Sequence, residues 1–178
     1  MTRLHTTAIS ESTGQAAQLF GAIKGAIGKV PNAYVTLGSN SPVALEAVLA
    51  LDGALKKSSL SAKQIEVIKI AVSQAVDCDY CVAAHTAIGK GAGLSREAIL
   101  AIRHGQPSGD VQHDALASFA RYLITTHGTV PAELLKAVTA AGFSDAQISD
   151  TSMVIAAITF TNIFNRINDT TVDFPAAD

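Results

Sequence analysis

Apolar residues recur with helical spacing along most of the chain, and the breaks between the apolar runs carry helix caps and glycines instead of hairpin signals. The pattern predicts about seven to eight helices and no strand. Their expected bounds are residues 11–27, 42–57, 62–76, 78–89, 95–104, 110–127, 131–142 and 149–168, the last preceded by turns that start at Ser144. We therefore expect an all-α helical bundle.

The predicted helix over residues 62–76 begins at a capping box, in which Ser61 and Gln64 satisfy each other's backbone amides. It ends directly before Asp77, which we expect to be the N-cap of the next helix, at 78–89. The apolar spacing of the first of these two helices predicts a buried stripe that includes Ile65, Ile68 and Val72.

The last predicted helix is apolar over most of its circumference. Such a helix is buried on several sides, and we expect a subunit interface to supply part of that burial. Three polar side chains interrupt the apolar pattern, and buried polar groups need partners. These residues are Asn162, Asn165 and Arg166. Their side chains either bond across the interface, line the active-site pocket or face water.

Length and charge narrow the class of protein. The 178 residues are the size of one domain, which we expect to span 1–178 with loose ends at 1–10 and 173–178. The net charge of -2, without a run of Lys or Arg, argues against nucleic acid as a partner. No apolar run reaches the roughly 18 residues of a membrane span, and no signal peptide is evident at the start. We expect a cytoplasmic protein without a membrane partner.

The sequence contains two cysteines, Cys78 and Cys81, in one short segment. Disulfides that staple a secreted protein join distant segments, so this spacing favours a catalytic or metal-binding role in a reducing compartment. On a helix that starts at Cys78, the two cysteines and His85 lie within about 60° of arc. The three side chains are therefore predicted to share one face.

Cys81 and His85 are four residues apart, so the imidazole can take the proton of the thiol or stabilise the thiolate. Cys78 lies one turn away, which lets one thiolate attack a peroxide or disulfide while the other resolves the product as an intramolecular disulfide. We expect Cys81 to be the activated sulfur and Cys78 its partner. Greater exposure of Cys78 in the first turn would reverse these roles.

Glu66 lies on the preceding helix and returns to the cysteines if the chain turns sharply at Asp77. There it could act as a base through a water molecule. The helix N-terminus lowers the pKa of nearby thiols, whereas Asp77 and Asp79 oppose this if their carboxylates point inward.

These residues also carry a family resemblance. Glu66, eleven residues, Cys78-x-x-Cys81, three residues and His85 resemble the signature of the AhpD (alkylhydroperoxidase D) branch of the carboxymuconolactone decarboxylase family. All four signature positions are occupied. Tyr80 stands between the cysteines where AhpD has a histidine, and many relatives have an aromatic residue there.

The resemblance implies an all-α fold and a homo-oligomer, a trimer or hexamer. It further implies that Cys78, Cys81, His85 and Glu66 reduce a hydroperoxide substrate. The resulting Cys78-Cys81 disulfide would be re-reduced by an external dithiol or by a lipoylated or thioredoxin-like protein. We expect neither a cofactor nor a metal ion.

Other interpretations of the same residues stay open. The cysteines could be small buried side chains, or they could bind zinc with His85 and either Glu66 or a water. The protein could also be a non-catalytic redox sensor or binding module. A last alternative is a cysteine-independent decarboxylase or hydrolase acting on a lactone-like substrate, although the founding decarboxylases of the family lack a redox cysteine pair.

Overall fold

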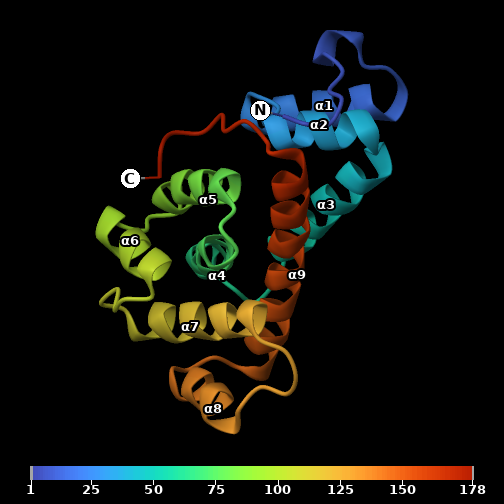
Figure 1. The fold of residues 1–178 in the computed structure, drawn as a ribbon. Coiled ribbons are helices and arrows are strands. Elements are labelled where there is room, and N and C mark those ends of the chain that lie inside the picture. The colour runs from blue at the N-terminus through green and yellow to red at the C-terminus, as the bar shows by residue number, and fades with distance from the viewer. Residues whose placement is uncertain (1, 178) are drawn as a thin grey trace.

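The computed structural model describes residues 2–177, and within them all regular structure is helical, which confirms the predicted all-α bundle. The described residues contain one 3₁₀ helix and nine α-helices (Figure 1). Their bounds are η1 Ile9–Glu11, α1 Gly14–Ile27, α2 Asn32–Asn40, α3 Pro42–Leu55, α4 Ala62–Ala75, α5 Asp79–Gly91, α6 Arg96–His104, α7 Val111–Thr125, α8 Ala132–Ala140 and α9 Asp145–Asn168. No helix among these residues is long and apolar enough to cross a membrane.

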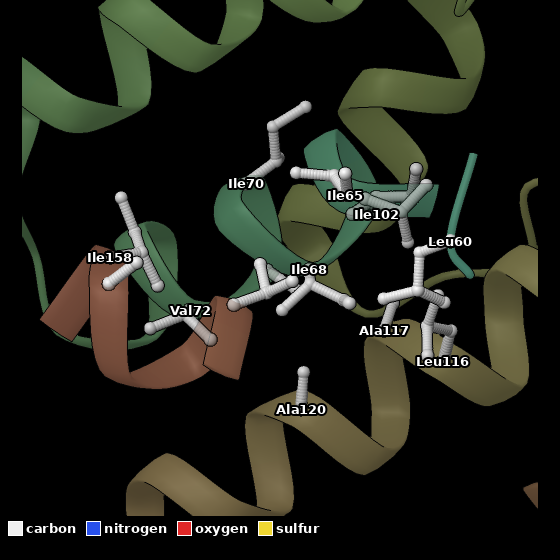
Figure 2. Packing of buried hydrophobic residues seen from close by; sticks show 14 of the residues in the cluster. Leu60, Ile65, Ile68, Ile70, Val72, Ile102, Leu116, Ala117, Ala120 and Ile158 are labelled. Atoms are coloured by element: carbon white, nitrogen blue, oxygen red, sulfur yellow. The ribbon is translucent and has the colours of Figure 1, made fainter. Parts of the chain in front are cut away.

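Helix α4 is the centre of the bundle. It packs against α5, α6, α7 and α9, and Figure 1 shows it end-on between them. The expected capping box of Ser61 and Gln64 is present at its start. Its burial extends beyond the predicted stripe, because Val67 and Ile70 are also fully buried. Figure 2 shows how side chains of α4 meet those of α6, α7 and α9 in one core.

A second, smaller core joins α1, α2 and α3. Its buried residues include Phe20 of α1, Leu37 of α2 and Leu45 of α3. Tyr34 of α2 packs against both cores and so connects this N-terminal layer to the bundle around α4. A cavity of about 620 Å³ lies at the boundary between the two layers.

Helix α2 is absent from the elements that the sequence pattern predicted. Its nine residues follow Pro31 and include Val35, Thr36 and Gly38, all weak helix formers. Tertiary packing compensates, because five residues of this short helix are buried. Intrinsic propensity is a weak guide where packing supplies most of the helical stability.

The junction between α4 and α5 also differs from the expected one. Asp77 is not the N-cap of α5; that position belongs to Cys78. Asp77 instead adopts a left-handed conformation with φ 52°, which Asp tolerates better than most residues. The amide of Asp77 donates to the carbonyl of Gln74 (3.3 Å) and that of Cys78 to the carbonyl of Ser73 (3.1 Å). These two bonds form a Schellman motif, in which Asp77 occupies the position usually taken by glycine.

Both ends of the described chain contact the bundle, although the sequence predicted loose ends at 1–10 and 173–178. The amide of Leu4 donates to the side chain of Asn168 at 2.9 Å. Phe174 packs edge-on against Tyr80, with ring centroids 5.7 Å apart. Residues 1 and 178 lie outside the described part of the chain.

Helix α9 is buried on one side and leaves an apolar stripe on the other. Phe160, Ile163 and Ile167 recur at helical spacing and are 41–57% exposed. The homo-oligomer inferred from the sequence stays a prediction. We expect its subunit interface to form on this apolar stripe. The mass of the purified protein in solution, measured by light scattering, tests it.

Gly38 of α2 lies close to side chains of α1 and α3. A Cβ atom at this position would lie 2.6 Å from Cε1 of Phe20 and 2.7 Å from Cδ2 of Leu45. We therefore predict that Gly38→Ala lowers the free energy of unfolding by about 1–3 kcal/mol through overpacking. Gly21→Ala on α1 is the matched control, because no neighbouring atom lies within 4 Å of its Cβ. It should be neutral or stabilise by up to about 1 kcal/mol. Denaturant unfolding measures both, and equal effects would contradict the packing argument.

Candidate active site

The turn after α4 places both sulfurs inside the protein. Cys81 lies in the first turn of α5, as the sequence predicted, whereas Cys78, also expected in that turn, is the N-cap. Both are free thiols with only 2% of their surface exposed. They are close enough for a hydrogen bond from one sulfur to the other. The structure therefore shows two neighbouring free thiols at the start of α5.

Glu66 and His85 meet directly beside this pair. Oε2 of Glu66 lies 2.8 Å from Nδ1 of His85, and both side chains are largely buried. A carboxylate only accepts hydrogen bonds, so Nδ1 of His85 is the donor to Glu66 and Nε2 is left to face other partners. The sequence-based expectation was that Glu66 acts through a water. In the structure Glu66 contacts His85 itself and fixes the orientation of its ring.

Two asparagines of α9 complete the surroundings of the sulfurs. Nδ2 of Asn165 donates to Sγ of Cys81 at 3.3 Å, and Nδ2 of Asn162 donates to Oγ of Ser73 at 3.1 Å. Both asparagines are at most 4% exposed, and the Oδ1 atom of each has no hydrogen-bond partner. Of the three roles considered from the sequence, a position beside the cysteine pair is the one that fits the contacts of these two residues.

These contacts move the pKa values of the two thiols in opposite directions. A hydrogen bond from Cys78 is the main cause that lowers the pKa of Cys81 to about 6. The charge of His85 and hydrogen bonds from Asn165 and Asn162 lower it further, whereas burial raises it. The same bond to Cys81, followed by burial, raises the pKa of Cys78. The surroundings of the pair therefore favour the negative charge on Cys81 and the proton on Cys78.

Tyr80, between the cysteines, has a structural role in this geometry. Its hydroxyl donates to Oδ1 of Asp173 at 2.8 Å and accepts from the amide of Ala33 at 3.2 Å. Burial and the neighbouring Asp173 raise the pKa of the phenol, so it keeps its proton. The side chain thus ties the start of α5 to α2 and to the C-terminal segment.

A cavity of about 620 Å³ reaches the same site from the N-terminal layer. Glu66 and His85 are part of its wall, together with apolar side chains of α1, α3 and α9 such as Ile23, Val48 and Ile158. Lys69 and Asp52 form an ion pair at 3.2 Å in the same wall. The volume is sufficient for a small organic molecule.

A separate hollow of about 250 Å³ borders Cys78. It shares no lining residue with the larger cavity. Among residues 2–177, no group of three or more His, Cys, Asp or Glu side chains could hold a metal ion.

Comparisons with known proteins agree with this geometry. The model of the carboxymuconolactone decarboxylase family matches residues 42–120, which contain Glu66, both cysteines and His85. The solved AhpD core of an uncharacterized peroxidase-related protein from Ralstonia eutropha has a TM-score of 0.84 at 22% identity, covering 97% of this chain and 92% of that one. The chain thus has an AhpD-like fold, and its residues 42–120 are similar to the carboxymuconolactone decarboxylase family.

Two further solved structures show the range of this AhpD-like fold. A protein of unknown function from Agrobacterium tumefaciens, a candidate antioxidant defence protein AhpD, is 26% identical over 75% of this chain and 92% of that one, with a TM-score of 0.69. A debrominase bound to 2,3,4-tribromopyrrole is 18% identical over 97% of this chain and 92% of that one, with a TM-score of 0.80. No curated protein matches the chain in sequence.

The structure brings together all four residues that the sequence singled out, Glu66, Cys78, Cys81 and His85. It adds Asn162 and Asn165, whose signal in the sequence was their position as polar residues in an otherwise apolar helix. Arg166, the third polar residue noted there, is exposed and lies at the edge of the smaller hollow.

The thiolate of Cys81 should titrate with a midpoint of about pH 6 in ultraviolet absorbance. We predict that His85→Ala and Asn165→Ala each raise this midpoint by about one unit, because each removes an interaction that favours the charged sulfur. His104→Ala, an exposed residue at the end of α6, is the control and should leave the midpoint unchanged. An unchanged midpoint in the His85 variant would remove that residue from thiolate stabilisation.

Proposed function

We propose that this protein is a thiol-dependent hydroperoxide reductase that cycles through a Cys78-Cys81 disulfide. The observation that carries the proposal is the stabilised sulfur of Cys81, which receives hydrogen bonds from Cys78 and Asn165 and lies near the imidazole of His85. A thiolate is the nucleophilic form of cysteine. A second thiol within hydrogen-bond distance is ready to resolve the first oxidation product.

The reaction would proceed in two steps on this pair. The Cys81 thiolate attacks the terminal peroxide oxygen, so that a sulfur–oxygen bond forms, the oxygen–oxygen bond breaks, and the alkoxide leaves and takes a proton to become an alcohol. Cys78 then attacks the sulfenic acid on Cys81, the disulfide forms, and hydroxide leaves with the proton of the Cys78 thiol as water. His85, held by Glu66, is the group placed to pass protons during both steps.

The larger cavity favours an organic hydroperoxide over hydrogen peroxide as the substrate. Its wall is mainly apolar, and burial of an apolar body there would contribute to binding. The Glu66 and His85 side chains contribute polar groups to this wall, and His85 also interacts with Cys81. Regeneration requires an external dithiol, and we place the cycle in the cytoplasm, where thiol reductants keep such a pair reduced.

Reductive dehalogenation of an aromatic halide is a second candidate function. It is favoured by the likeness to the debrominase and by the apolar cavity beside His85. The electron balance is the same: the halide is replaced by hydrogen and leaves as the anion, while two thiols become a disulfide. Parallel incubation of the reduced protein with cumene hydroperoxide and with 2,3,4-tribromopyrrole distinguishes the two, since only the true oxidant yields the disulfide together with its reduced product.

The test of the peroxidase proposal is intact-mass analysis after one equivalent of cumene hydroperoxide. We predict the loss of two hydrogens per chain, formation of one equivalent of the alcohol, and full reversal by dihydrolipoamide. Cys78→Ser should stop at a sulfenic acid on Cys81, seen as the gain of one oxygen, because the resolving thiol is missing. Cys81→Ser should not react at a comparable rate.

Three other outcomes would contradict the proposal. Persistently unreactive thiols would mean that the cysteines do not carry redox chemistry. A disulfide that forms once but is not restored by the dithiol would favour a redox sensor. Activity on a lactone-like substrate that survives replacement of both cysteines by serine would favour a decarboxylase or hydrolase.

A further inference from the structure

The cysteine pair can be approached from two sides with different chemistry. The larger cavity is mainly apolar and reaches Glu66 and His85, whereas the smaller hollow is polar and reaches Cys78. Neither sulfur lines the larger cavity, and only Cys78 lines the smaller hollow. The hollow is therefore the side from which a second reactant has direct access to a sulfur of the pair.

The hollow has a buried floor and a charged rim. Cys78, Asn165 and Thr170 are buried at its floor. The rim is formed by exposed charged residues, namely Asp77, Asp79, Arg166 and Asp169. Asp169 also lies 3.9 Å from the guanidinium of Arg3. Two carboxylates thus flank Cys78 directly in the chain, and with Asp169 they outnumber Arg166, the cationic residue of the rim.

Asn165 provides an independent sign that the hollow accepts a ligand. Its side chain is 4% exposed, its amide nitrogen is used by Cys81, and its Oδ1 atom has no partner. A buried acceptor without a donor is unfavourable, by about 1–3 kcal/mol. Asn165 lines the hollow, so a molecule there that donates a hydrogen bond would satisfy this oxygen once the side chain turns toward it.

We propose that this hollow is the docking site of the reducing thiol, that the reductant attacks Sγ of Cys78, and that the rim selects neutral or cationic thiols over anionic ones. The inference rests on the proposed redox cycle and adds the site and the charge class of the reductant. A volume of about 250 Å³ suits a narrow thiol-bearing chain, either a small dithiol or one carried on a flexible arm.

Thiol–disulfide exchange reduces the oxidised pair in two steps. The thiolate of the reductant forms a bond to Sγ of Cys78, the Cys78-Cys81 bond breaks, and its electron pair leaves on Cys81. The second thiol of the reductant then attacks its own sulfur in the mixed disulfide, which releases Cys78 as a thiolate that takes up a proton. Cys81 is the better leaving group of the two, because its pKa is lowered and that of Cys78 is raised.

The selectivity is tested on the reductive half of the cycle alone. The disulfide is prepared with diamide, so that no peroxide is needed, and reduced with cysteamine, 2-mercaptoethanol or 2-mercaptoethanesulfonate, which are cationic, neutral and anionic. The rate constant of each thiol is expressed per thiolate and divided by the rate constant of the same thiol with a small-molecule disulfide. At low salt we expect cysteamine to exceed the sulfonate by about tenfold, and salt should reduce the ratio.

Substitutions of the charged rim residues test whether the hollow causes the selectivity. Asp77→Asn with Asp79→Asn should reduce the ratio about threefold or more, and asparagine is also compatible with the left-handed conformation at position 77. Arg166→Gln should increase the ratio, because it removes a positive charge. Asp145→Asn, an exposed residue at the opposite end of α9, is the matched control and should leave the ratio unchanged.

Acid quenching and peptide mapping identify the attacked sulfur, which should be Cys78 in the mixed disulfide with cysteamine. A mixed disulfide on Cys81, or a ratio that the rim variants do not alter, would overturn the inference. A second result separates the two proposals. If diamide forms the disulfide and its reduction shows the expected selectivity, but peroxide does not form the disulfide, the proposed function is wrong and the docking site stands. Failure of diamide to form the disulfide would overturn both.

Discussion

The hydrogen bond between Cys78 and Cys81 is the interaction on which the rest of the site depends. It needs both sulfurs on the same side of one turn, and the Schellman motif at the end of α4 supplies that geometry by placing Asp77 in a left-handed conformation. The surroundings give the bond a direction: Asn165 and His85 favour the charge on Cys81, and the proton is then favoured on Cys78. A thiolate that is 2% exposed would otherwise be costly to bury.

The position of each helix determines which side chains it supplies to the surroundings of the cysteine pair. The buried helix α4 presents Glu66 and α5 presents His85, so the imidazole is oriented from within the core. Helix α9 presents its asparagines to the sulfurs and its apolar stripe to the outside. The proposed routes of oxidant and reductant lie on different sides of the pair, because the two hollows share no lining residue.

The local parts of this architecture could be predicted from the sequence, whereas the parts made by tertiary contact could not. The capping box at Ser61 and the face shared by Cys81 and His85 follow from spacing along one helix. Helix α2 could not be predicted, because packing around Gly38 overrides its weak helix propensity. The contact of Asn165 with Cys81 joins residues far apart in the chain, and the sequence offered only an interrupted apolar pattern.

The central claim is that Cys81, and not Cys78, carries the thiolate. Its most direct test is a brief pulse of iodoacetamide on the reduced protein at a series of pH values, followed by peptide mapping of both cysteines. The account predicts that alkylation of Cys81 rises with a midpoint at about pH 6 and dominates at neutral pH, while Cys78 stays largely unlabelled. Preferential alkylation of Cys78, or a midpoint for Cys81 near the value of an ordinary thiol, about 8.5, would contradict it.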